Sequence, residues 1–442
     1  PGGYAKGYHQ KFHDACKARI SVFDDGENAV ALVGLDALFI MEDDVAEVRR
    51  RVAEATGIPA SGVLIGASHS HSSGPTGMVK QGEYDHASEL VQDLAYEQSS
   101  AADPVYLKRM IDGIVEGIIE AWEGRSELLI GFGSGKEEKV SFNRRWRMKN
   151  GLSFTHPRYG NPEGKLVGCV VNFACHATTS PRGISANWPW GLEKVIRGTF
   201  GEEVVVVFLN GNSGDVTQVD NASPFRRESG EVDALRVGGS VGAEAVKVLL
   251  DIPPAARKNE FDVDVRQEFL KIPRRKPSPE RLASSLEMVQ EKPSEAKALN
   301  DWIWAKEIVM LDALIQKEPV RNVEVQAIKV GPAVFISNPA EYFCEFGLQQ
   351  KAGSEFPFTW PVSLANGCVG YVPTTEALGP KGGGYETRLT AYSNLVPEAG
   401  DQIRDKGIEL ANDMKPDAAP KGTPAPEFDG AGWQYGSVPE LE

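Results

Sequence analysis

The sequence predicts an α/β fold in which a mixed sheet is flanked by helices. Apolar segments of strand length alternate along the chain with longer segments whose apolar residues recur at helical spacing. This alternation is typical of a sheet covered by helices on its faces. The expected strands are 29–39, 62–67, 166–175 and 204–209, and the expected helices are 42–56, 106–122, 188–200 and 232–250.

The first strand–helix–strand unit shows the pattern most clearly. Residues 29–39 (AVALVGLDALF) and 62–67 (GVLIGA) are almost continuously apolar, as expected of strands buried on both faces. The segment 42–56 between them places valines at helical spacing, and Gly57 is a typical helix stop. The two strands should therefore lie in one sheet with the helix packed against it.

The C-terminal part of the chain predicts further elements of a different character. A segment at about 273–318 is polar and largely helical, and we expect a helical insert that protrudes as a hairpin or lid. Residues 323–337 predict two strands, and 341–351 predict a helix. The sequence therefore predicts a single domain over 1–414, followed by a Pro/Gly-rich tail over 415–442.

Composition excludes several roles. The 442-residue chain has a formal net charge of −15 and a pI near 5.1, so it repels phosphate backbones and general nucleic-acid binding is excluded. No apolar run of about eighteen residues occurs, so we expect no transmembrane segment. The five cysteines include no C-x-x-C pair, which argues against a cysteine zinc site. Because the chain starts at Pro1, we expect a removed signal peptide and a secreted or periplasmic location.

Three of the seven histidines stand where expected strands end in loops. His69 and His71 form an H-x-H pair after 62–67, so both side chains face one side of an extended backbone. His176 follows the apolar run of 166–175. Such imidazoles can bind one metal, or one can bind while another hydrogen-bonds; a hydrogen-bonded histidine at the edge of a core has the same pattern.

Two other classes of metal hydrolase begin with H-x-H, but the chain lacks their remaining ligands. Metallo-β-lactamases continue as H-x-H-x-D-H, whereas Ser73 and Gly74 occupy the matching positions here. Amidohydrolase barrels require eight recurring strands and additional histidines that the chain does not supply convincingly. The loop NGNSGDVTQ after 204–209 offers Asp215 and Thr217 to orient a metal ligand or bind substrate, although its glycines also fit a simple turn.

Taken in chain order, these loops resemble the motifs of the neutral/alkaline, non-lysosomal ceramidase family. ASHSHSSGP is similar to the family's T-H-T-H-S-G-P loop, whose first histidine binds zinc and whose second lines the site, corresponding to His69 and His71. NFACHATTS resembles F-x-x-H-x-T-S, which supplies a second zinc ligand, here His176. Five further segments are similar to family motifs: SFNRR with Arg144, NSGDVTQ with Thr217, NPAEYF with Glu341, ANGCVGYVPTTEAL with Tyr371 and GGGYETR with Tyr385.

The resemblance implies a ceramidase-like catalytic domain that cleaves an amide bond of an N-acyl substrate by a metal-activated water. The implied Zn²⁺ ligands are His69, His176, Glu341 and Tyr371. The residues expected to act in catalysis are His71, Arg144, Asp215, Thr217 and Tyr385. Thr217 and Gln218 replace a serine and a proline of the family, and we expect no counterpart of the family's C-terminal β-sandwich domain. We therefore expect an altered substrate pocket.

Two alternative functions fit the same residues. One is a hydrolase of this fold that acts on a carbohydrate or another small polar substrate, which Trp146, Trp188 and Trp190 near the motif loops would favour, although such residues more often serve packing. The other is a non-catalytic homologue that binds a metal or ligand, which the replacement of serine by Thr217 keeps open.

Overall fold

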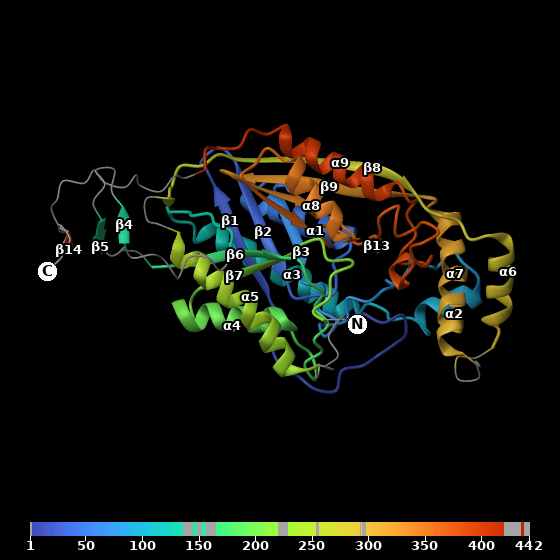
Figure 1. Ribbon diagram of the computed structural model, residues 1–442. Helices are drawn as coiled ribbons and strands as arrows, with labels where there is room; N and C mark the ends of the chain where they lie inside the picture. The colour runs from blue at the N-terminus through green and yellow to red at the C-terminus, as the bar shows by residue number, and fades with distance from the viewer. Residues whose placement is uncertain are drawn as a thin grey trace.

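A computed structural model describes most of the chain, and it confirms the α/β class. It covers residues 2–135, 145–147, 153–155, 165–219, 229–252, 256–291, 293, 298–419 and 435–436, of which 145–147, 153–155 and 435–436 are described by their backbone alone. Helices lie on both sides of a group of sheets, and α2, α6 and α7 gather at one end of the molecule (Figure 1).

The strands form several sheets rather than one. In the first sheet, of order β1-β2-β3, β2 is antiparallel to β1 and parallel to β3; in the second, of order β12-β10-β9-β8, only the β10–β12 pair is parallel. Two parallel pairs, β6–β7 and β11–β13, and the antiparallel set β14-β5-β4 complete the description. The strands are β1 Ala18–Asp24, β2 Ala29–Leu35, β3 Val63–Ala67, β4 Arg145–Arg147, β5 Ser153–Thr155, β6 Gly168–Phe173, β7 Val205–Asn210, β8 Val263–Pro273, β9 Val320–Val330, β10 Ala333–Ser337, β11 Glu341–Tyr342, β12 Phe358–Val362, β13 Tyr371–Val372 and β14 Tyr435–Gly436.

The helices agree closely with the expected ones in the first half of the chain. The expected segments 42–56 and 188–200 are helical over those same residues, and Gly57 ends the first helix with a φ of +80°, a conformation that glycine adopts without strain. The α-helices are α1 Glu42–Thr56, α2 Glu89–Tyr96, α3 Pro104–Glu123, α4 Trp188–Phe200, α5 Glu231–Asp251, α6 Pro279–Met288, α7 Leu299–Lys317, α8 Cys344–Gly353 and α9 Ala399–Asn412.

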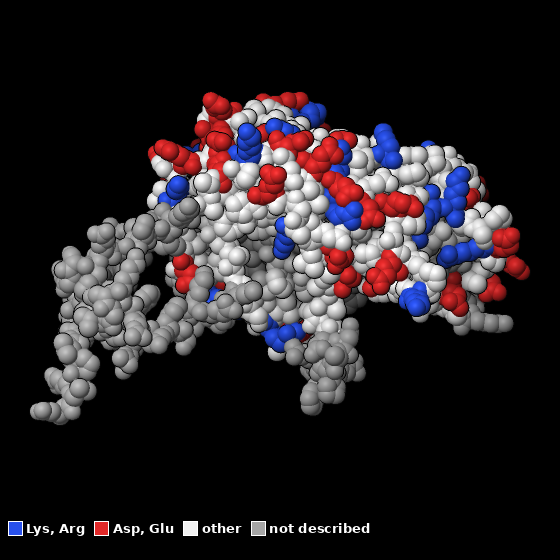
Figure 2. Space-filling model, turned by 45° about the horizontal axis from the view of Figure 1, so that its top comes forward, with Lys and Arg blue, Asp and Glu red and all other residues white. Residues whose placement is uncertain are grey.

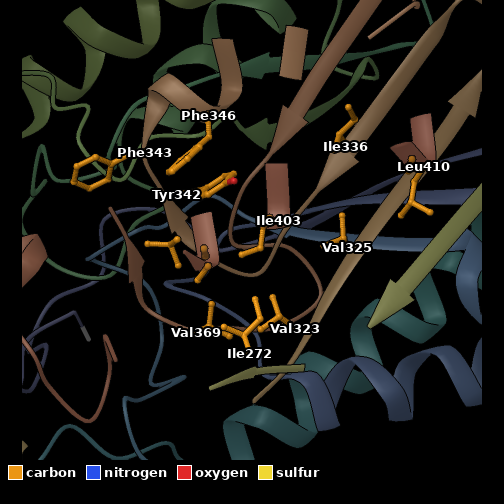
Figure 3. Packing of buried hydrophobic residues seen from close by; sticks show 14 of the residues in the cluster. Ile272, Val323, Val325, Ile336, Tyr342, Phe343, Phe346, Val369, Ile403 and Leu410 are labelled. Carbon is orange, nitrogen blue, oxygen red and sulfur yellow. The ribbon is translucent and has the colours of Figure 1, made fainter. Parts of the chain in front are cut away.

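Packing orders these elements into a helix–sheet–sheet–helix stack. Alternate residues of β2 face opposite layers: Val33 packs with α1 and α3, whereas Leu32 packs with Leu209 and Phe335 of the facing strands. The other face of β9 and β10 packs against α8 and α9, where Val325, Ile336 and their neighbours form the largest core cluster (Figure 3). Burial on both faces explains why β2 and β3 are apolar throughout rather than alternating.

One expected helix begins later than its sequence pattern indicates. The segment 341–351 was expected to be helical throughout, but α8 begins at Cys344, and Glu341 lies in the short strand β11. The backbone N–H of Glu341 donates to Gly370 O, and β11 pairs in parallel with β13. Pairing with this distant segment overrides the helix propensity of the residues before Cys344, because tertiary contacts routinely outweigh such weak local preferences.

The segment expected as a helical insert contains α6 and α7, which pack together at the end of the molecule (Figure 1). The wider segment was expected to be polar, but the longer helix α7 is mostly apolar and largely buried. Trp302, Met310 and Leu314 pack with Tyr84 and Leu94 in one cluster. α7 is thus part of a local core rather than a freely protruding hairpin. Residues 420–434 and 437–442 of the expected tail lie outside the described residues.

No helix in the described part of the chain is both long enough and apolar enough to cross a membrane. On the face shown in Figure 2, acidic and basic side chains are interspersed, although the whole chain carries a net charge of −15.

A buried ion-pair network ties β1 to α4. Arg19 lies 2.8 Å from Asp36 and 2.6 Å from Glu193, and Lys17 lies 3.1 Å from Glu193. Burial alone would raise the pKa of Glu193, but the hydrogen bonds and charges of Arg19 and Lys17 outweigh it and lower the pKa to about 2. The carboxylate therefore stabilises the folded state in its ionised form.

We expect Glu193→Gln to lower the free energy of unfolding by about 3 kcal/mol, because the Arg19 charge would stay buried with one partner fewer. Since the folded pKa lies below the ordinary value of 4.5, the stabilisation is present above pH 4.5 and is lost as the pH falls toward 2. Urea unfolding at pH 7 and pH 3 measures both effects. Glu54→Gln removes an exposed pair with Arg50 and should cost less than about 0.5 kcal/mol; equal losses for the two variants would contradict the prediction.

Candidate metal centre

Four segments that are distant in sequence meet at one point. His69 and His71 follow β3, His176 follows β6, and Glu341 and Tyr371 lie in β11 and β13. An isolated parallel bridge between Ser70 and Ala177 brings the two histidine loops together. In the β11–β13 pair, Glu341 is the direct register partner of Tyr371. The centre thus lies where strands end, as the sequence led us to expect.

The donor atoms at this point are close to one another. Glu341 Oε2 lies 3.1 Å from Nε2 of His69 and 3.1 Å from Nε2 of His176. The Tyr371 hydroxyl is 3.3 Å from His176 Nε2, and Nε2 of His71 is 3.1 Å from Nε2 of His69. His69 and Glu341 are 2% and 3% exposed, so these polar groups meet almost out of contact with solvent.

Backbone carbonyls fix the orientation of two imidazoles. His69 Nδ1 lies 3.0 Å from Leu38 O, and His176 Nδ1 lies 2.7 Å from Ser213 O. A carbonyl only accepts, so each Nδ1 carries a proton, and in the neutral ring Nε2 then has a lone pair. Both Nε2 atoms face the carboxylate of Glu341. With both rings neutral, several acceptors converge on one buried point, an arrangement that a bound cation stabilises.

The spacing of these donors fits a metal ion. Zinc bonds of about 2.0–2.1 Å in a tetrahedron place neighbouring ligand atoms roughly 3.3 Å apart. Three separations are close to this value: 3.1 Å from Glu341 to each of His69 and His176, and 3.3 Å from Tyr371 to His176. Among the described residues, the ligand atoms of His69, His71 and His176 also lie within 4.8 Å of one another. This buried group can hold a metal ion.

Burial and mutual contact shift the pKa values of these groups in the metal-free protein. Burial, with the neighbouring His69, lowers the pKa of His71 to about 3, so its imidazole is neutral. Burial would raise the pKa of Glu341, but His69 and His176 outweigh it and hold that pKa well below the ordinary range. Burial would lower the pKa of His176, but the hydrogen bond and charge of Glu341 outweigh this effect and raise that pKa. The carboxylate is therefore ionised.

The backbone at the centre is strained in two places. His69 has a φ of +60° and Asn187 a φ of +69°, a region that costs a non-glycine residue about 1–3 kcal/mol. The Asn187 side chain accepts hydrogen bonds from Thr179 N and Trp188 N, and Trp188 Nε1 donates to His176 O. Such strain persists where surrounding contacts hold the backbone in place, and these hydrogen bonds do so here.

The remaining residues expected from the sequence have different positions. Tyr385 is 55% exposed, and its hydroxyl lies 3.4 Å from that of Tyr371, at the open side of the centre. Arg144 lies outside the described residues, as does the side chain of Trp146. Trp188 is fully buried and packs on Phe208, so it does not line a substrate pocket.

The loop after β7 contributes through its backbone. Asp215 and Thr217 were expected to orient a ligand or bind substrate, and these roles stay predictions. Asp215 is exposed and accepts a hydrogen bond from Cys344 N at the start of α8. Thr217 is also exposed and accepts from Val219 N. Ser213 O is what orients His176. A main-chain contact of this kind carries no residue-type signal, which explains why the sequence did not reveal it.

The sequence also missed Tyr392, whose hydroxyl donates to Glu341 Oε1 at 2.8 Å. It stands in the segment TAYSN, which matches none of the motifs above, so only its position in the fold reveals it. A second unexpected neighbour is Gly2, where an ideal Cβ would lie 2.3 Å from Nδ1 of His71. The N-terminal segment therefore borders the centre.

Comparison with solved structures identifies the class of fold. A neutral ceramidase from Pseudomonas aeruginosa matches with a TM-score of 0.59 at 16% identity, over 90% of this chain and 69% of that one. A ceramidase complexed with C2 matches with a TM-score of 0.58 at 15% identity, over 93% of this chain and 75% of the other. No family model and no curated protein matches the sequence. The chain thus has a divergent ceramidase-like fold, as its motifs had suggested.

We expect His69→Ala and His176→Ala each to abolish tight binding of a divalent metal, because each removes a nitrogen donor from a buried centre. Metal content after dialysis against a metal-free buffer measures this. His86→Ala is the matched control, since His86 is exposed and bonds to Ala313 O away from the centre. Full retention of metal by both site variants would refute the assignment.

We also expect metal binding to weaken as the pH falls. The pKa of His176 in the metal-free protein is raised above 6.5, so a proton competes for Nε2 already near neutral pH. Below that pKa, the apparent affinity should fall about tenfold per pH unit for one displaced proton. Competition with a chelator between pH 8 and pH 5.5 measures the slope; a flat profile would contradict the prediction.

Proposed function

We propose that this protein is a zinc-dependent hydrolase of ceramidase type that cleaves the amide bond of an N-acyl substrate. The observation that carries the proposal is the meeting of two Nδ1-anchored histidines with Glu341 and Tyr371, at separations close to those of a tetrahedral zinc site. Two imidazoles, a carboxylate and a phenol are the zinc ligands of this proposal. His71 is assigned to the substrate side, because no backbone carbonyl within the described residues fixes its Nδ1 as one fixes those of His69 and His176.

The surrounding residues support amide hydrolysis. Zn²⁺ bound at this centre would supply a Lewis acid for the substrate carbonyl and lower the pKa of a water molecule to about 7. His71, whose Nε2 lies 3.1 Å from Nε2 of His69, could stabilise the oxyanion or pass a proton to the leaving group. Burial raises the pKa of Tyr385, so its hydroxyl keeps its proton and can donate a hydrogen bond to the developing oxyanion.

A second candidate function, hydrolysis of a small polar substrate, is favoured by a neighbouring cavity. This cavity of about 390 Å³ reaches Tyr392, which contacts Glu341. Its lining combines apolar side chains such as Met310 with the charged side chains of Glu83, Arg274 and Arg321. A few charged groups in a partly apolar pocket can orient a small polar substrate. Burial of Trp188 removes one of the tryptophans that the sequence had offered for a carbohydrate pocket.

Hydrolysis assays on the purified, zinc-loaded chain test the proposal. We expect release of a labelled fatty acid from an N-acyl amino alcohol, with a loss of at least about 100-fold in Glu341→Ala, since removing a ligand disables the metal. Glu345→Ala, an exposed change four residues away, should retain full activity. Stripping the metal should abolish turnover, and re-adding Zn²⁺ should restore it.

The other outcomes separate the candidates. Activity on aryl glycosides or small polar amides, without activity on N-acyl amino alcohols, would support the second function instead. A zinc-loaded protein that turns over none of these substrates would overturn both and leave a metal-binding protein without catalysis. Secretion or a periplasmic location remains a separate prediction, tested by fractionating the native host.

A further inference from the structure

The two carboxylate oxygens of Glu341 have different partners. Oε2 lies 3.1 Å from Nε2 of His69 and 3.1 Å from Nε2 of His176, at the centre of the donor cluster. Oε1 points the other way and accepts a hydrogen bond from the Tyr392 hydroxyl at 2.8 Å. An ionised carboxylate only accepts, so the phenol must be the donor. The side chain is therefore held from both ends.

The fold fixes Tyr392 itself. Its ring packs on Phe39 at 6.0 Å and on Tyr4 and Tyr371 at 6.4 Å between ring centroids, and Cys368 Sγ lies 3.4 Å from the hydroxyl. The next residue, Ser393, accepts a hydrogen bond from the backbone N–H of Tyr371 at 2.9 Å. The segment that carries Tyr392 is thus attached to the strand that carries another proposed ligand.

We propose that Tyr392 is a positioning residue that makes Glu341 a one-oxygen ligand, presenting Oε2 to the metal and keeping Oε1 out of the coordination sphere. This inference rests on the proposed metal centre. A buried carboxylate whose outer oxygen loses its donor can rotate, bind through both oxygens, or take up a proton. Each of these changes would alter the set of atoms around the metal, which would otherwise be the two histidine nitrogens and a single oxygen of Glu341.

A second tyrosine of the same cavity, Tyr84, provides a control for Tyr392. Tyr392 and Tyr84 line the same cavity, and both rings are packed among apolar side chains. Only Tyr392 bonds to a proposed ligand; the phenol of Tyr84 has no such bond within the described residues. Tyr84→Phe therefore matches Tyr392→Phe in chemistry and cavity, but not in contact with Glu341.

The decisive measurement is the Zn²⁺ dissociation constant of the full chain, by competition with a chromophoric chelator at pH 7.5. We expect Tyr392→Phe to bind Zn²⁺ about 10–100-fold more weakly than the wild type, the usual effect of losing a hydrogen bond to a metal ligand. Tyr84→Phe should bind within about twofold of the wild type. The melting temperature of each metal-free variant shows whether it is folded.

The results distinguish this inference from the proposed function. If the wild type binds no zinc, the proposed metal centre is overturned. If the wild type and Tyr392→Phe both bind zinc tightly and with equal affinity, only the role of Tyr392 is overturned. If Tyr392→Phe and Tyr84→Phe weaken Zn²⁺ binding equally, the effect belongs to the cavity, and the proposed role of Tyr392 is overturned. Should Tyr392→Phe fail to fold, a zinc-loaded wild-type crystal structure decides: we expect Glu341 bound through Oε2 only, and binding through both oxygens would contradict the proposal.

Discussion

The centre depends on hydrogen bonds from two imidazole nitrogens to main-chain carbonyls. Leu38 O accepts from Nδ1–H of His69, and Ser213 O and Val216 O accept from Nδ1–H of His176, so both Nε2 atoms face the same buried point. Without these contacts either ring could adopt the other tautomer or turn away. Leu38 follows β2 and Ser213 follows β7, so the relative position of two sheets sets the geometry of the site.

Close packing between layers is what holds those sheets in place. A Cβ at Gly34 would lie 2.4 Å from Phe208 O, so β2 and β7 approach as closely as only glycine allows. The apolar residues of both faces of β2 fill the space on either side of it. Because packed layers resist small displacements, the loops at their ends can hold polar groups against one another at the cost of local strain, as at His69.

The two sides of the Glu341 carboxylate contact different polar groups. On one side, His69 and His176 keep the carboxylate ionised and share its inner oxygen. On the other side, Tyr392 donates to the outer oxygen and also lines a cavity with both apolar and charged side chains. Tyr371 and the partly exposed Tyr385 extend the group toward solvent.

The sequence by itself determined the α/β class and most elements of the first half, because these follow from apolar periodicity. Its motifs also predicted His69, His176, Glu341 and Tyr371 as one group, through their resemblance to a known family, and these side chains lie together in the structure. Only the tertiary structure decided that Glu341 lies in a strand, that Ser213 acts through its carbonyl, that Asp215 bonds to α8, and that Tyr392 reaches Glu341. The physical reason is that these contacts join segments far apart in sequence, and some use main-chain atoms that every residue type shares.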